Sequence, residues 1–365
     1  MVQEKPNFIN GCVKNGIPEK TATKIWDKME KFCEYAFNKS HSTGYAIIAA
    51  QTAWLKYYHK SIFMAEVLNS YLQKADELAF YIQRFKESGI NILRPDVNRS
   101  DINFKSVGEN EILFGLSGIK NMGKVAYDII KERETNGVYE SFYDFIKRTQ
   151  NFINTRSITA LIDAGAFDSL HKSRKGMKGK MNALLDSAKK NNKNNVAGQM
   201  GFFSGILVDE GQDIEDLNIY EKLELEHEST GMYISSHPAE VFRKDKIARD
   251  KNVRDNEFPH LNELIHKSEC LTFAVIKNIR TFYTKDRFYP ILAFDLEDGS
   301  KLVKGVMFQD STNGNSDMGL LSGDVVLVVG QYFKSRKYGY QFRVQSIVEN
   351  ESLRLRKELP LEKIS

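Results

Sequence analysis

The alternation of apolar and polar residues between Leu271 and Val348 constrains the fold more than any other feature of this chain. Apolar residues recur there at every second position in about five short segments, joined by turns such as Asp298-Gly299 and Tyr338-Gly339. A period of two is typical of β-strands that bury one face. Five short antiparallel strands in one compact stretch predict a small β-barrel of the OB type.

Helical periodicity governs the first part of the chain. Pro18 opens one predicted helix, and further helices are expected over Ile62 to Leu72 and Ala75 to Lys86. The segment from Thr43 to His59 is apolar on nearly every side, so we expect a buried helix rather than a surface helix with a polar stripe. It follows a polar turn, Asn38 to Ser42, which suits either a helix cap or a contact with phosphate.

Short strands are expected between Ile90 and Gly115, followed by helices at 124–133, 141–148 and 157–164. Between His171 and Asn195 eight Lys or Arg residues occur with one acid, ending in a polar tract that we expect to be flexible. From Asp209 to Glu228 nine acids occur with one lysine. This inversion of charge predicts a domain boundary in a multidomain α+β protein.

The composition is that of an ordinary globular protein, with 41% hydrophobic and 27% charged residues and a net charge of +4. No apolar run approaches the ~20 residues that cross a bilayer, so no membrane partner is expected. The first residues lack the basic and apolar regions of a secretory signal. These features favour a cytoplasmic protein.

The segment from Phe114 to Lys124 alternates apolar residues, glycines and a lysine in the pattern of a helix-hairpin-helix motif. Glycines let the backbone approach a phosphate, whose charge amide groups and a lysine can meet. An ordinary loop between helices is the alternative. The candidate residues for binding a duplex backbone are Gly118, Ile119, Lys120, Asn121, Gly123 and Lys124.

A short segment, Gln199-Met200-Gly201-Phe202-Phe203, lies in a polar part of the chain. Two adjacent phenylalanines with a nearby glutamine suit an extended peptide that docks into an apolar pocket. The alternative is a short buried strand. We also considered His227 and His237 as metal ligands, but their spacing favours structural roles. The expected barrel surface combines bases and aromatics suited to single-stranded nucleic acid, among them Phe282, Lys285, Arg287, Lys334, Arg336, Lys337 and Tyr338; edge-protecting charges are the alternative.

Several of these segments, in this order, resemble the alpha subunit of bacterial DNA polymerase III, the C-family replicative DNA polymerases. The resemblance is carried by 34–56, by the hairpin 114–124, by 161–168 and by 225–238. It implies five regions: the C-terminal part of the fingers (1–95), a helix-hairpin-helix and clamp-binding region (96–208), an acidic connecting arm (209–268), an OB domain (269–350) and a tail (351–365).

The resemblance also implies roles for single residues. Asn38, Lys39 and His41 would face the nucleotide or the primer–template, and Gln199 to Phe203 would bind the sliding clamp. The expected partners are duplex and single-stranded DNA, the clamp, other replisome subunits and an N-terminal part of the polymerase that carries the catalytic palm.

We find no palm motif with paired aspartates in this sequence, and we assign no catalytic residue, metal ligand or cofactor to it. Mg²⁺ belongs to the palm in this family. The family is a DNA-directed DNA polymerase, but this chain alone is therefore expected to be inactive. Two other functions are compatible with parts of the sequence: a non-catalytic DNA-binding protein tethered to the clamp, and an RNA-binding OB module, which leaves the clamp peptide and hairpin unexplained.

Overall fold

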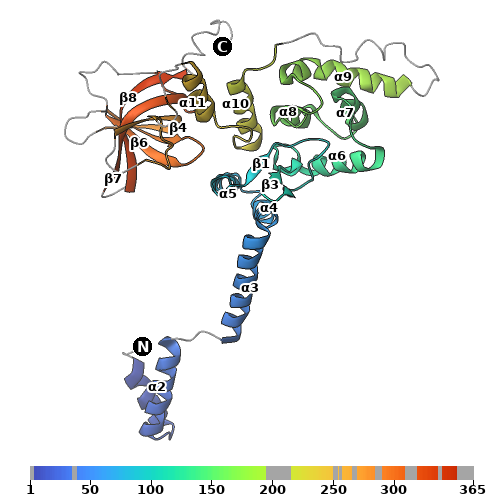
Figure 1. Cartoon of the computed structure of the whole chain (residues 1–365). Coiled ribbons are helices and arrows are strands. Elements are labelled where there is room, and N and C mark those ends of the chain that lie inside the picture. Colours follow the sequence, from blue (N-terminus) through green and yellow to red (C-terminus); the bar gives the residue numbers. More distant parts are fainter. Residues whose placement is uncertain are drawn as a thin grey trace. The chain divides into compact units, whose positions relative to one another are not determined.

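The computed structural model describes residues 4–34, 39–194, 215–249, 254, 257–264, 269–283, 290–308, 319–335 and 339–351. It divides into two compact units, Met1–Lys60 and Ser61–Ser365, which are described separately here (Figure 1). Within the described ranges no helix combines the length and apolarity needed to span a membrane.

The first unit consists of α1 (Lys5–Lys14), α2 (Glu19–Glu34) and α3 (Lys39–Tyr58). The rings of Phe8 on α1 and Trp26 on α2 lie 5.3 Å apart, and Trp26 is 4% exposed. An ion pair of 2.8 Å between Lys5 and Asp27 joins the same two helices. The two helices therefore form a pair joined by an aromatic contact and an ion pair.

The predicted helix over 43–59 is present as α3, but the prediction that it is buried is wrong for the structure described here. Ile47, Trp54 and Tyr57 are 54%, 53% and 79% exposed. Burial requires a second apolar surface, and among the described residues of this unit only α1 and α2 make an extensive helix–helix contact. The sequence of α3 thus presents an apolar surface without a polar stripe.

The second unit begins with a helical body, defined here as its described residues up to Thr230. Its helices are α4 (Lys60–Ser70), α5 (Ala75–Glu87), α6 (Gly123–Asn136), α7 (Phe142–Thr149), α8 (Thr155–Asp163), α9 (Arg174–Asn194) and α10 (Ile219–Thr230). A three-stranded sheet of β1 (Asn91–Leu93), β2 (Lys105–Gly108) and β3 (Glu111–Leu113) has the order β1-β3-β2. Strands β1 and β3 are parallel, and β2 and β3 are antiparallel.

One apolar core joins these elements. Phe145 on α7 and Phe167, which follows α8, are both fully buried, with their rings 4.8 Å apart. Side chains cap two of the helices: Ser141 accepts from the amide of Asp144 at α7, and Asn154 accepts from the amide of Ser157 at α8. The segments 141–148 and 157–164 thus form helices as predicted.

The basic stretch after His171 differs from its prediction. It forms the long helix α9, which continues to Asn194 through most of the polar tract expected to be flexible. Met177, Leu184 and Ala188 are buried on one side of this helix. The apolar residues at helical spacing bind α9 to the core, and the high proportion of lysine hid this pattern.

The second half of the acidic stretch lies in α10, which begins with a capping box between Asn218 and Glu221 and is followed by Gly231 in the left-handed region. The next helix, α11 (Pro238–Arg249), packs on the barrel, where Phe242 contacts Phe273 with ring centroids 5.1 Å apart. Residues 231–237, called the connector below, link these two helices.

The barrel consists of β4 (Glu269–Tyr283), β5 (Pro290–Glu297), β6 (Leu302–Phe308), β7 (Val325–Ser335) and β8 (Gly339–Asn350). The sheet closes in the order β4-β5-β6-β8-β7. A closed five-stranded barrel in which β4 pairs with β7 and β6 pairs with β8 has the OB architecture, so the predicted fold is confirmed. The expectation that all strands are antiparallel is wrong for one pair, because β6 and β8 are parallel.

A buried cation fastens α10 to the rest of the helical body. Arg174 is 1% exposed, and its guanidinium donates to both carboxylate oxygens of Asp168 at 3.0 and 2.7 Å. It also pairs with Glu226 of α10 at 3.0 Å, and Glu226 has no exposed surface. Glu226 accepts in turn from the backbone amide and the hydroxyl of Ser235 in the connector, at 3.1 and 2.7 Å.

We predict that Arg174→Met lowers the free energy of unfolding by about 3–5 kcal/mol, because it leaves Glu226 buried without its charge partner. Urea unfolding of the wild-type and variant chains measures the change. Arg94→Met is the matched control: Arg94 pairs with the same Asp168 at 2.6 Å but is 46% exposed, so its loss should cost less than about 1 kcal/mol. Equal losses in the two variants would contradict the role given to the buried pair.

Candidate nucleic-acid interface

The predicted hairpin is a tight turn between β3 and α6 whose shape depends on glycine. A Cβ atom on Gly115 would lie 2.3 Å from the carbonyl carbon of Asn103, and one on Gly118 would lie 2.7 Å from the ring of Phe114. Neither position has room for a side chain. A 3₁₀ helix, Leu116–Gly118, occupies this narrow space and leads into the turn before α6.

The turn has a buried side and an exposed side. Ile119 and Met122 are 2% and 1% exposed and anchor it in the core. Lys120, Asn121 and Lys124 are exposed, and Gly123 is exposed between them. Asn121 and Gly123 have φ values of +65° and +38°, which turn the backbone so that these residues face outward.

Two neighbouring helices hold the hairpin in place. The hydroxyl of Ser157 at α8 donates to the carbonyl of Asn121 at 2.8 Å. The amide of Lys120 donates to the carbonyl of Ser229 on α10, also at 2.8 Å. Hydrogen bonds from α8 and α10 to backbone groups of Asn121 and Lys120 therefore fix the position of the turn's exposed side.

The N-terminus of α6 has the electrostatic properties of an anion site. Met122 at the N-cap offers no side-chain hydrogen bond, and the first turn contains no acidic residue. The first amides of a helix have no partner within the helix, and the helix dipole makes this end positive. With Lys120 and Lys124 beside it, this end of α6 can receive a phosphate group.

The other predicted sites fall partly outside the described residues. Asn38 and the clamp-peptide residues Gln199, Met200, Gly201, Phe202 and Phe203 lie outside them. Lys39 begins α3, and its side chain also lies outside the described set. His41 is exposed, and its ring meets that of Tyr45 at a centroid distance of 4.4 Å. His41 belongs to the first unit, whereas the hairpin belongs to the second.

On the barrel, Phe282 and Lys334 lie near the ends of β4 and β7, and both are exposed. The ammonium group of Lys334 lies 5.5 Å from the ring centre of Tyr340, which stacks on Tyr332 at 5.3 Å. Five predicted residues of the two adjoining loops lie outside the described residues, namely Lys285, Arg287, Arg336, Lys337 and Tyr338. The loops that contain them are those an OB barrel uses to bind oligonucleotides.

The sequence analysis missed a second cation–aromatic pair on the barrel. Arg343 on β8 lies 5.1 Å from the ring centre of Phe308 on β6, and Phe308 is 49% exposed. Phe282, Ile291 and Phe308 are direct neighbours across β4, β5 and β6. The period-two pattern of the sequence places Phe308 and Arg343 at outward positions of their strands. Only the strand register shows that the two side chains are neighbours. The surface combines ring faces with positive charge, which suits stacking and phosphate contacts.

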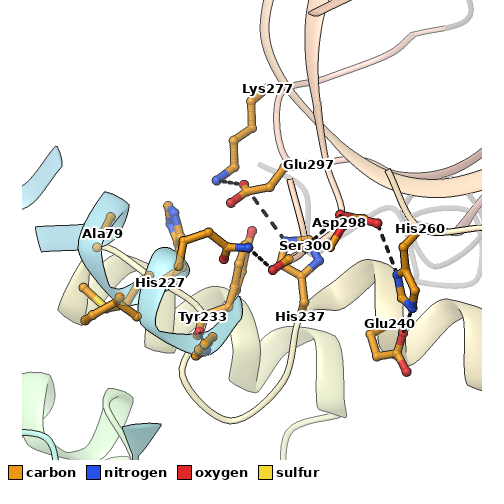
Figure 2. Close-up of a pocket in the computed structure, with 16 residues that line it drawn as sticks. Ala79, His227, Tyr233, His237, Glu240, His260, Lys277, Glu297, Asp298 and Ser300 are labelled. Carbon is orange, nitrogen blue, oxygen red and sulfur yellow. Dashed lines mark hydrogen bonds and ion pairs between the residues drawn. The ribbon is translucent and has the colours of Figure 1, made fainter. Parts of the chain in front are cut away.

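A pocket with a volume of about 360 Å³ is lined by α5, α10, the connector and the barrel, and charged side chains are among its lining residues (Figure 2). Tyr233 lies between two histidine rings, 4.7 Å from His227 and 5.0 Å from His237. Lys277 and Glu297 of the barrel form an ion pair at the same place. The sequence analysis gave both histidines structural roles, and within the described ranges no group of three possible metal ligands occurs.

Burial and charge alter the acid–base properties of this pocket. Burial alone would raise the pKa of Glu297, but His237 and Lys277 lower it from the usual 4.5 to about 2. Burial lowers the pKa of Lys86, whose ammonium group donates to the carbonyl of Tyr233 at 3.0 Å. Burial also lowers the pKa of His227, with nearby Lys277 acting in the same direction. The carboxylate of Glu297 thus stays ionised in this pocket because His237 and Lys277 lie beside it.

Comparison with known proteins shows which family the chain resembles. A helix-hairpin-helix family model matches residues 89–177, which include the glycine turn. DNA polymerase III subunit alpha from Borreliella burgdorferi is 32% identical over 97% of this chain and 31% of its own length. The corresponding subunits from Thermus aquaticus and Aquifex aeolicus are 36% and 35% identical, over 90% and 84% of this chain.

The chain belongs to the DNA polymerase III alpha subunit family. It corresponds to a C-terminal portion of these subunits and spans less than a third of the length of the relatives named above. Among solved structures, the chain is similar to the second OB-fold domain of replication protein A from Methanococcus maripaludis, with 19% identity and a TM-score of 0.21 over 24% of this chain and 90% of that domain. The predicted family is thereby confirmed, and the barrel is assigned from its own strand order.

We predict that acid weakens the fold partly through Glu297. Because the folded-state pKa lies below the usual value, its stabilisation is complete above pH 4.5 and is lost as the pH falls toward 2. The effect should be on the order of 3 kcal/mol. Unfolding free energies measured from pH 7 to pH 2 should fall less steeply in Glu297→Gln than in the wild type.

The control for this series is Glu87→Gln, which removes an exposed carboxylate from α5. This variant shows how much the dependence of the unfolding free energy on pH changes when one surface charge is lost. If Glu297→Gln followed the wild-type profile throughout, the ionised pair in the pocket would contribute nothing to acid stability.

Proposed function

We propose that this chain is the part of a bacterial replicative DNA polymerase III alpha subunit that holds DNA during template-directed synthesis. The observation that carries the proposal is the hairpin: a glycine turn, anchored by buried Ile119 and Met122, presents two lysines at the uncapped start of α6. This arrangement suits the backbone of a duplex, because amide groups and lysines meet phosphates without reading bases.

The barrel supplies a second DNA contact in this proposal. The exposed rings of Phe308 and Tyr340 lie beside Arg343 and Lys334, respectively, and Phe282 is exposed near the end of β4. Unpaired bases stack on aromatic rings while cations follow the phosphates, a combination that favours single strands over duplex. The single-stranded template is the ligand that fits these contacts.

The third contact is with the sliding clamp, through Gln199 to Phe203 in the segment between α9 and α10. Phe202 and Phe203 would fill an apolar pocket of the clamp, and Gln199 would orient the peptide. Tethering to a ring around DNA raises the effective concentration of the polymerase at the primer end, which is the physical basis of processive synthesis.

The chemistry itself is assigned to protein outside this chain. Paired carboxylates holding Mg²⁺ would come from the palm of the same polymerase, which acts in the cytoplasm. The turn with Asn38, Lys39 and His41 would face the nucleotide or the primer–template beside that palm. The exposed apolar surface of α3, including Ile48 and Trp54, supports a contact with this further part of the polymerase.

We predict that Lys120→Ala combined with Lys124→Ala weakens binding to duplex DNA uniformly across sequences. Each lysine that neutralises a phosphate contributes about 1 to the slope of log affinity against log salt concentration, so the slope should become shallower by about 2. Fluorescence anisotropy with a labelled duplex over a salt series measures this slope. Lys131→Ala, an exposed lysine farther along α6, is the control. An unchanged slope in the double variant would exclude the hairpin as a phosphate contact.

A separate prediction concerns the clamp. Phe202→Ala with Phe203→Ala should reduce affinity for a bacterial sliding clamp by roughly 30-fold or more, as expected when anchors of about 2 kcal/mol are removed. Calorimetric titration of the chain with the clamp measures the loss, and duplex binding should not change. Leu207→Ala removes an apolar residue just after the motif and serves as the control. Unaltered clamp affinity in the double variant would remove this partner.

A further inference from the structure

The two proposed DNA-binding surfaces belong to different bodies of the second unit. The hairpin lies on the helical body, whereas the aromatic surface lies on the barrel. The connector, residues 231–237, passes between α10 and α11 and contacts both bodies. How firmly it is held determines whether the two surfaces act independently or together.

On one side the connector is fastened to the helical body. Buried Glu226 receives two hydrogen bonds from Ser235 and pairs with Arg174. The ammonium group of Lys86 on α5 donates to the carbonyl of Tyr233 at 3.0 Å. The hairpin is joined to the same place, because the amide of Lys120 bonds to Ser229 at the end of α10.

On the other side the connector meets the barrel. The ammonium group of Lys277 lies 5.5 Å from the ring centre of Tyr233, and the Nε2 atom of His237 lies 4.0 Å from an Oε atom of Glu297. A Cβ on Gly299 would be 3.0 Å from Cβ of His237, so the two backbones approach closely. Gln83 of α5 also donates to the carbonyl of Gly299. Figure 2 shows Tyr233, His237, Lys277 and Glu297 around one pocket.

This contact differs in kind from the cores on either side of it. Lys86, Tyr233, His237, Lys277 and Glu297, called the joint below, surround a cavity of about 360 Å³. The Nε2 atom of His237 lies 4.0 Å from the Glu297 oxygen that pairs with Lys277, which is beyond hydrogen-bond distance. By contrast, α11 packs on the barrel through apolar side chains. A polar, partly hollow contact can be loosened by one substitution while both cores stay intact.

We propose that the joint fixes the position of the barrel relative to the hairpin, so that one DNA molecule with a duplex beside a single strand contacts both surfaces at once. The residues of the joint are positioning residues and touch no DNA. This inference rests on the proposed function, because it requires that each surface binds its own form of DNA.

The physical reason is effective concentration. When one surface has bound, a rigid link presents the second at a high local concentration, and the gain falls as the link becomes free to move. A rigid link also loses less conformational entropy than a flexible link when both surfaces bind DNA. The joint should therefore affect binding of the junction and leave the separate affinities unaltered.

The test compares three DNAs with the full chain at one salt concentration: a duplex, a single strand, and a duplex with a 5′ single-stranded extension. The wild type should bind the junction about 100-fold more tightly than the better of the two separate forms. Lys86→Met should reduce this advantage at least tenfold, while affinities for the duplex and the single strand stay within about twofold. Gln83→Ala, which removes the contact with Gly299, is a second variant and should act in the same direction.

Arg84→Met is the matched control, because it removes a positive charge from the exposed side of the same helix. It should retain the full junction advantage. Thermal unfolding of each variant confirms that the cores are intact. A full advantage in both joint variants overturns the inference. No advantage in the wild type, with both separate forms bound, also overturns it but leaves the proposed function standing. Failure to bind either separate form overturns both.

Discussion

The buried pairing of Arg174 with Asp168 and Glu226 is the interaction on which the second unit depends most. It places a cation with almost no exposed surface between the end of α8, the start of α9 and the middle of α10. A buried charge is tolerated only with well-oriented partners, so these elements can meet in one arrangement. Because Glu226 also binds Ser235, the same network directs the chain from the helical body toward the barrel.

The hairpin and the pocket follow from this arrangement. Lys120 bonds to Ser229, one turn after Glu226, so the exposed side of the glycine turn is tied to the helix that Arg174 holds. On the other face, Tyr233 and His237 meet Lys86, Lys277 and Glu297 in the pocket. Two surfaces suited to nucleic acid are thus linked by the connector, whose Met232 and Ile234 are buried in the core of the helical body and whose Tyr233 and His237 meet the barrel.

Much of the architecture could be predicted from local patterns. Period-two alternation placed the five strands of the barrel, and glycines at 115, 118 and 123 marked the hairpin before its geometry was known. The exposure of α3 was not predictable, because apolar residues on all sides of a helix indicate burial but do not show which surface would cover it. The amphipathic side of α9 was obscured by its lysines, and the parallel pairing of β6 with β8 depends on barrel closure.

The sequence by itself determined which segments form helices and strands, where the turn needs glycine, and which residues carry cations and rings, because these depend on neighbours a few positions apart. Only the tertiary structure decided which distant residues meet. Arg174 and Glu226 are 52 positions apart, and Gln83 and Gly299 are 216 apart. No local period records such pairs, since they arise when packing of the cores brings remote segments together. The pocket, the joint and the pairing of Arg343 with Phe308 belong to that second group.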